Sequence, residues 1–161
     1  MQIEAINAMT AEQFVGAVGW VFEHSPWVAE RTSHKRPFAS VAELSDRMNT
    51  TVREALRDEQ LALLCAHPDL GTRMQVSSGS ASEQMGAGLN QLTESEYTEL
   101  VNLNNAYRLK FGFPFLSAVK GRGKTEIIAA MRARSGADPE IEFEEALRQV
   151  FRIARFRLED L

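Results

Sequence analysis

Residues 142–161 have the sequence EFEEALRQVFRIARFRLEDL, in which apolar side chains recur every three or four positions. At about 100° per residue of an α-helix, these apolar residues fall on one arc. They are Phe143, Leu147, Val150, Ile153, Ala154, Leu158 and Leu161. Arg157 falls inside the same arc, whereas Arg148, Arg152 and Arg155 project to the other side. The spacing predicts a long terminal helix that buries one face, with an arginine on that face.

Signals for helix starts are repeated along the rest of the chain. A Ser or Thr followed three positions later by Glu or Gln forms a capping box, which satisfies the unpaired amides of a first helical turn. Such pairs are Thr10 with Gln13, Ser40 with Glu43, Ser80 with Glu83, and Thr93 with Glu96. Ser25 before Pro26, Asp58, the start at Thr125 and Asp138 before Pro139 indicate four further helices. The capping pattern therefore predicts helices throughout the chain.

Helix ends and loops complete this prediction. His67-Pro68 ends one helix, because proline disfavours helical geometry in the residue before it, and Gly112 ends another. Residues 68–79 contain glycine and serine and predict a loop. We find no internal repeat and no convincing alternating strand. The expected fold is all-α, a single compact domain over residues 1–161 with about seven to eight helices and no significant sheet.

Composition narrows the classes of function. The chain has 161 residues, 44% of them hydrophobic and 25% charged, which is ordinary for a globular protein. Its formal net charge of −4 supplies no positive field for nucleic acid or anionic lipid, and no stretch approaches 18 uninterrupted apolar residues. The single cysteine, Cys65, cannot form an internal disulfide. We expect a cytoplasmic protein that binds neither nucleic acid nor membrane.

The basic stretch at residues 120–125, KGRGKT, resembles a phosphate-binding loop but fails the full pattern. That pattern requires a glycine five residues before the Gly-Lys pair, where this chain has Ala118, and a preceding strand, which is not predicted. A solvated basic turn that leads into a helix is favoured. Nucleic-acid binding through residues 120–124 would show a steep salt dependence and ranks last among the functions considered.

Arg157 and His67 each allow more than one interpretation. A core-facing arginine must reach solvent, pair with a carboxylate, or meet a bound anion or carbonyl, because an unpaired buried charge is costly. His67 directly follows an apolar run, residues 61–66. Its imidazole is either a structural group bonded to backbone carbonyls or a proton-transfer group at a rigid turn. No second histidine or carboxylate lies at the spacing of metal ligands on a helix, so no metal site is predicted.

The pair Ser80 and Glu83 also has two explanations. A serine cap with a glutamate in the first turn accounts for both residues structurally. Gln84 and the small residues 86–88, Gly-Ala-Gly, would permit close approach of a ligand to the backbone. A helix N-terminus also presents amides to carbonyl or anionic groups.

Taken together, motifs over nearly the whole chain resemble the family of 2-oxo-4-hydroxy-4-carboxy-5-ureidoimidazoline (OHCU) decarboxylase, which forms (S)-allantoin in urate degradation. The motifs are Phe22-Glu-His-Ser-Pro-Trp-Val-Ala-Glu30 with Arg36-Pro37-Phe38, Ala66-His-Pro-Asp-Leu-Gly71, Ser80-x-x-Glu83-Gln84 with Ala87-Gly88-Leu89, Asn104-x-x-Tyr107-x-x-Lys110-Phe-Gly-Phe-Pro-Phe115, Ala118-Val-Lys-Gly121 and Arg157-Leu158. Their number and order make the resemblance more specific than any one motif.

The resemblance implies a helical carboxy-lyase that acts on a small ureidoimidazoline without a cofactor, and it suggests a homodimer. It implies three catalytic residues, His67, Glu83 and Arg157. The substrate-binding residues that it implies are Pro68, Ser80, Gln84, Leu116, Ser117, Ala118 and Val119, the last four through backbone amides. His67, Glu83 and Arg157 are then expected to converge around a cavity. The competing hypothesis is a non-enzymatic helical adaptor in which Arg157 is salt-bridged and His67 is structural.

Overall fold

The computed structural model describes residues 1–71 and 77–161, and the regular elements within these ranges are all helical. The elements are α1 (Ile3–Asn7), α2 (Ala11–Val18), the 3-10 helix η1 (Gly19–Val21), α3 (Trp27–Ser33), α4 (Val41–Arg53), α5 (Arg57–Cys65), α6 (Ser78–Gly86), α7 (Glu94–Phe111), α8 (Lys124–Arg134) and α9 (Pro139–Glu159). The predicted all-α class is confirmed. The eight helices that the capping signals predict are all present, and the short α1 is an addition that no side-chain cap announces.

Contacts between Cα atoms group these helices into two units. The first unit comprises Met1–Ala66 and Phe151–Leu161, and the second comprises His67–Val150. Helix α9 therefore supplies its first part to the second unit and its last part to the first. The prediction of one domain over residues 1–161 stays a prediction.

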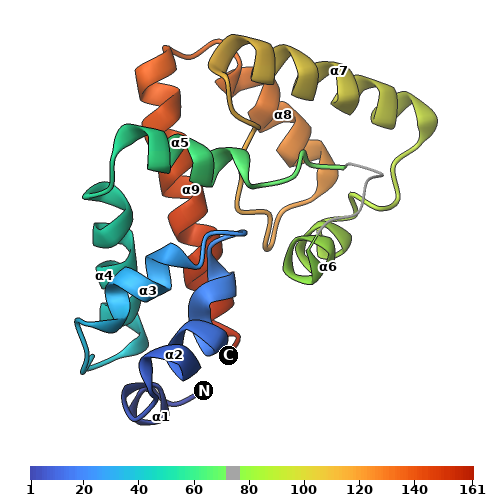
Figure 1. The fold of residues 1–161 in the computed structure, drawn as a ribbon. Helices are drawn as coiled ribbons and strands as arrows, with labels where there is room; N and C mark the ends of the chain where they lie inside the picture. The colour runs from blue at the N-terminus through green and yellow to red at the C-terminus, as the bar shows by residue number, and fades with distance from the viewer. Residues whose placement is uncertain (72–76) are drawn as a thin grey trace. The chain divides into compact units, whose positions relative to one another are not determined.

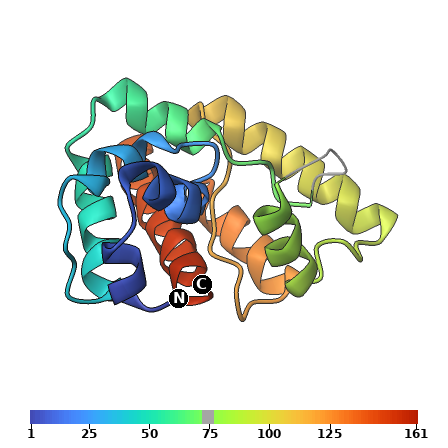
Figure 2. The ribbon, with the colours of Figure 1, turned by 60° about the horizontal axis from the view of Figure 1, so that its bottom comes forward.

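In the first unit, α2 contacts α3, and α3 contacts α4 (Figure 1). The apolar arc of the terminal helix supplies buried residues to this core, and the Phe22 ring meets the Phe151 ring edge-on with 6.5 Å between centroids. The two chain termini both belong to this unit and lie close together (Figure 2). All members of the predicted arc are buried except Leu161, which is half-buried and follows the end of α9, so the amphipathic helix that the spacing indicated is confirmed.

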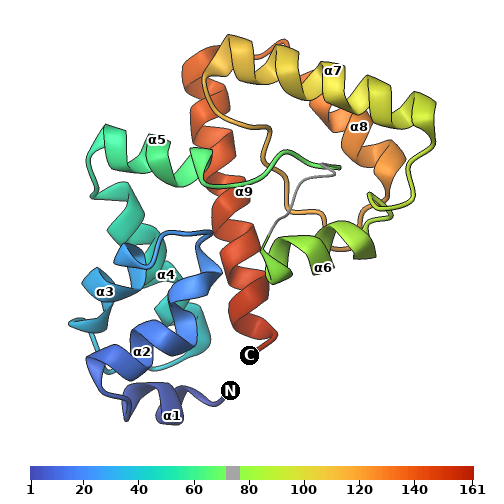
Figure 3. The same cartoon turned by 45° about the vertical axis from the view of Figure 1, so that its right-hand side comes forward.

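In the second unit, α7 and α8 run side by side (Figures 1 and 3). Tyr107 of α7 is fully buried, and its ring packs against those of Phe111, Phe113 and Phe115. Its hydroxyl donates to the buried Glu142 carboxylate, which Arg134 also contacts. Burial, together with the neighbouring Glu142 carboxylate, raises the pKa of the Tyr107 phenol above its usual value.

Three predicted helix starts are confirmed by their cap contacts. Complete capping boxes are present at Thr10 with Gln13 and at Thr93 with Glu96. Ser40 accepts a hydrogen bond from the Glu43 amide, while the Glu43 carboxylate accepts from Ala39 instead of Ser40. Gly112 ends α7 in the left-handed conformation, as predicted.

Three predicted caps are wrong, and in the first two a neighbouring side chain accepts a hydrogen bond from an amide at the helix start instead. Ser80 does not begin α6: Ser77 offers the same hydroxyl three residues earlier and accepts from the Ser80 amide at 3.2 Å. Asp58 does not cap α5, which begins one residue earlier and uses the Glu59 carboxylate as the acceptor of the Leu56 amide.

Ser25 does not cap α3 either. Its hydroxyl donates to the Glu23 carbonyl at 2.9 Å, and α3 begins at Trp27. Part of the predicted loop 68–79 is also corrected, because residues 78 and 79 are helical; residues 72–76 lie outside the described ranges.

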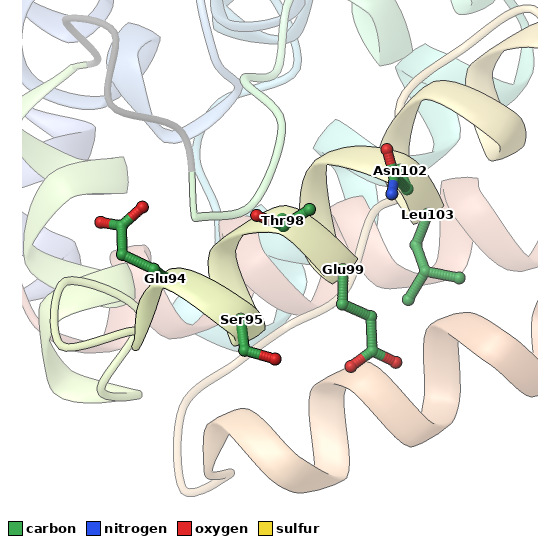
Figure 4. Close-up of a pocket in the computed structure, with 6 residues that line it drawn as sticks. All are labelled: Glu94, Ser95, Thr98, Glu99, Asn102 and Leu103. Carbon is green, nitrogen blue, oxygen red and sulfur yellow. The ribbon is translucent and has the colours of Figure 1, made fainter.

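An open pocket of about 640 Å³ lies on the exposed face of α7. Its lining residues are Glu94, Ser95, Thr98, Glu99, Asn102 and Leu103 (Figure 4). The Glu99 carboxylate at its edge forms an ion pair with Arg132 of α8. These lining residues do not include any residue that the sequence predicts for the site.

Nowhere in residues 1–71 and 77–161 does a helix have the length and apolarity needed to span a membrane.

Gly71→Ala should destabilise the protein far more than Gly112→Ala. Both glycines have positive φ, +70° and +81°, so each alanine incurs the left-handed penalty of about 1–2 kcal/mol. A Cβ at position 71 would also lie 2.2 Å from the Leu100 Cδ2 atom of a buried side chain, whereas position 112 has nothing within 4 Å. Overpacking adds about 1–3 kcal/mol. Urea unfolding measures the difference, and equal losses would contradict the described packing.

Candidate active site

His67 opens the second unit, immediately after the C-cap of α5 at Ala66. Only 6% of the residue is exposed, and Pro68 follows it. Proline fixes its own φ and restricts the residue before it, so the backbone that carries the imidazole has few conformations. The position combines burial with a rigid turn, which suits either of the two roles considered for His67.

Helix α6 carries Ser80, Glu83 and Gln84, at positions i, i+3 and i+4, on one face. Ser80 and Gln84 are buried and Glu83 is half-buried. The Gln84 Oε1 atom accepts a hydrogen bond from the Gly71 amide at 2.8 Å. The structure thus joins this face of α6 to the segment that begins at His67.

The segment from Leu116 to Val119, whose amides are predicted to bind substrate, is buried. In the sequence it lies between α7 and α8. The Ala118 amide donates to the Gln149 Oε1 atom at 2.9 Å. The Ser117 hydroxyl accepts from Arg122 at 3.0 Å, and the Leu116 carbonyl accepts from Arg134 at 2.6 Å. Side chains of the same unit therefore hold this segment, and the Ala118 amide already serves Gln149.

Arg157 belongs to the first unit and is 4% exposed. Its Nη2 atom lies 2.9 Å from a carboxylate oxygen of Glu23, which is itself buried. Its Nη1 atom donates to the Trp20 and Val21 carbonyls, both at 3.4 Å. The core-facing arginine therefore pairs with a carboxylate and also meets backbone carbonyls.

Sequence reasoning missed two residues that hold predicted site residues, and a third that holds the segment following His67 and Pro68. Glu23 pairs with Arg157, Gln149 accepts from Ala118, and the Asn104 amide donates to the Leu70 carbonyl at 3.0 Å. Glu23 and Asn104 lie in the quoted motifs, which was the available signal, but periodicity assigns them no partner. For metal binding, the described ranges contain no group of three or more His, Cys, Asp or Glu side chains that could hold an ion.

The comparison with known proteins supplies the family. A family model described as OHCU decarboxylase matches residues 7–159. This chain belongs to the OHCU decarboxylase family. Membership confirms the predicted enzyme class, a carboxy-lyase of urate degradation that forms (S)-allantoin.

Curated relatives of the OHCU decarboxylase family include both short and long proteins. The chain is 44% identical over 158 residues to the OHCU decarboxylase of Haloferax volcanii, covering 98% of this chain and 94% of that protein. It is 43% identical over 159 residues to the uric acid degradation bifunctional protein PucL of Bacillus subtilis, covering 99% of this chain. The chain spans 32% of that longer protein.

Two solved structures share the fold of this OHCU decarboxylase family member. A crystal structure of (S)-allantoin synthase is 31% identical, with a TM-score of 0.82 over 99% of this chain and 54% of that one. A crystal structure of OHCU decarboxylase in the presence of (S)-allantoin is 25% identical, with a TM-score of 0.70. That likeness covers 83% of this chain and 89% of the other.

Glu23→Gln should destabilise the protein by about 3–5 kcal/mol, because it leaves the buried Arg157 guanidinium without its carboxylate. Glu159→Gln is the matched control: it removes the same charge from the exposed pair with Arg155, where about 0.3–0.5 kcal/mol is expected. Chemical unfolding of both variants measures the two losses. A loss of similar size in both would show that the buried pair contributes no more than a surface pair.

Proposed function

We propose that His67, Glu83 and Arg157 carry the decarboxylation of OHCU in this chain, with Ser80, Gln84 and the amides of Leu116, Ser117 and Val119 orienting the ring. The Ala118 amide donates to Gln149, so it holds the segment in place and does not serve the ring. The observation that carries this proposal is the hydrogen bond from the Gly71 amide to Gln84. It ties the segment that begins at His67 and Pro68 to the helix that also carries Glu83. A proton-transfer group and a hydrogen-bonding carboxylate are therefore held within one structural unit.

The reaction requires a place for the electron pair of the bond that breaks. When the carboxylate leaves as carbon dioxide, the pair can delocalise into the C=N unit next to the reacting carbon of the substrate ring. A proton delivered to the neighbouring carbon then gives allantoin. Since the substrate has its own electron sink, we propose a reaction without a cofactor, in which the protein positions groups and moves protons.

His67 takes the proton of the 4-hydroxyl group or returns a proton to the intermediate. An imidazole titrates near neutral pH, so it can act as acid or base under working conditions. Pro68 restricts the backbone conformation of His67, and delivery of the proton from one face accounts for the single enantiomer of the product. In this proposal Pro68 positions the imidazole through the backbone.

Glu83 accepts hydrogen bonds from the ureido and ring N–H groups of the substrate. Its half-buried position on α6 leaves part of the side chain accessible to a ligand. Arg157 binds an anionic or carbonyl oxygen. A guanidinium has five N–H donors in a fixed plane, so it can serve Glu23 and a substrate oxygen together.

The competing adaptor hypothesis expects a salt-bridged Arg157, and the structure contains that salt bridge. Family membership nevertheless favours the enzyme, because an adaptor needs none of the matching motifs.

We further propose a homodimer, which the family resemblance suggests, and a cytoplasmic location, which the single cysteine suggests. Light scattering of the purified chain tests the dimer.

His67→Asn should lower turnover by at least about 10²-fold, because general acid-base catalysis contributes about 10²- to 10⁴-fold. The matched control is His34→Asn, which removes an exposed imidazole of the first unit. Turnover is followed by the ultraviolet decay of freshly generated OHCU, the product by optical rotation, and folding by circular dichroism. Near-normal turnover of folded His67→Asn would remove His67 from the mechanism.

A further inference from the structure

The three residues that follow Pro68 are held by one face of α7. Asp69 forms an ion pair with Arg108 at 2.8 Å, the Leu70 carbonyl accepts from Asn104, and Gly71 lies against Leu100. Positions 100, 104 and 108 are four residues apart and therefore share one face of the helix. Because the contacts run down α7 as the chain runs from 69 to 71, this segment lies antiparallel to α7.

The Leu70–Gly71 peptide group is bound at both of its polar atoms. Its carbonyl oxygen accepts from the Asn104 Nδ2 atom at 3.0 Å, and its N–H donates to the Gln84 Oε1 atom at 2.8 Å. Both hydrogen bonds are buried, and the two side chains come from different helices, α7 and α6. Two buried side-chain amides on opposite edges of one peptide group leave its plane little freedom to rotate.

The two polar contacts between α7 and this segment differ in strength. The Asp69–Arg108 pair is exposed, with 32% and 44% of the side chains accessible, and exposed pairs contribute little. Asn104 is 5% exposed, and removing one partner of a buried hydrogen bond leaves the other polar group unsatisfied. Of these two polar contacts, the one made by Asn104 therefore contributes more to fixing this segment.

We propose that Asn104 is a positioning residue for His67. By fixing the peptide group three residues after His67, it sets the path of a segment whose other end is restricted by Pro68. The same peptide group binds Gln84, so Asn104 also sets the placement of His67 relative to the substrate-facing side of α6. This inference rests on the proposed proton-transfer role of His67.

Asn104→Asp tests the proposal with little change of shape. The Nδ2 donor becomes a carboxylate oxygen that repels the Leu70 carbonyl, so the segment should shift. A misplacement of about 1 Å can cost about 10²-fold in rate, so we expect kcat to fall by about that factor, with a smaller change in KM. Asn105→Asp is the matched control: the neighbouring residue is exposed, and its variant carries the same added charge.

Two further measurements separate positioning from a general loss of stability. The imidazole NMR resonances of His67 should shift in Asn104→Asp and stay unchanged in Asn105→Asp. In a double-mutant cycle, Asn104→Asp should cost little additional turnover once His67 is replaced by Asn, because Asn104 acts through the missing imidazole. Asn104→Ser keeps a hydroxyl donor on a shorter side chain, and its loss of kcat should be smaller than that of Asn104→Asp.

Specific outcomes overturn the inference. Normal kcat in folded Asn104→Asp or Asn104→Ser would do so, as would losses that multiply fully in the double mutant. Should Asn104→Asp not fold, the test rests on Asn104→Ser: a reduced kcat with shifted His67 resonances supports the inference, and a normal kcat overturns it. Normal turnover of His67→Asn would instead refute the proposed function itself, so the two failures are distinguishable.

Discussion

A buried guanidinium is the constraint on which the first unit depends. Arg157 lies within the apolar arc of α9, where a charge without a partner would cost several kcal/mol. Glu23, far away in the sequence, provides the opposite charge, and backbone carbonyls next to it accept further hydrogen bonds. The chain around Glu23 must therefore meet the terminal helix, which joins the two ends of the sequence in one core.

The second unit depends on a comparable arrangement of neutral groups. The segment after His67 has no helical hydrogen-bond ladder, so its backbone groups need other partners. Asn104 and Gln84 supply them for a single peptide group, and Gly71 allows α7 to approach because it lacks a Cβ atom. The segment after His67 is therefore held by side chains that also belong to the proposed site or lie beside it. Gln84, which binds the Gly71 amide, is itself proposed to orient the substrate.

Local signals predicted where most helices lie, because capping and amphipathic spacing act over three or four residues. They failed where two candidate caps compete, as at Ser77 and Ser80, since neighbouring serines offer equivalent hydroxyls and packing decides between them. Periodicity and local pattern single out Arg157, His67 and the pair Ser80 and Glu83, but their roles in a site come from the order of the motifs. The partners of the site residues, such as Gln149 for Ala118, could not be found in the same way, because nothing local relates positions 31 residues apart.

The sequence by itself determined the all-helical class, the amphipathic terminal helix with its misplaced arginine, and the family resemblance. These follow from short-range spacing and from the order of motifs along the chain. Only the tertiary structure decided that Glu23 neutralises Arg157 and that Asn104 and Gln84 bind the same peptide group. A hydrogen bond or ion pair between distant positions depends on how helices pack, and packing is a property of the whole core rather than of any local stretch.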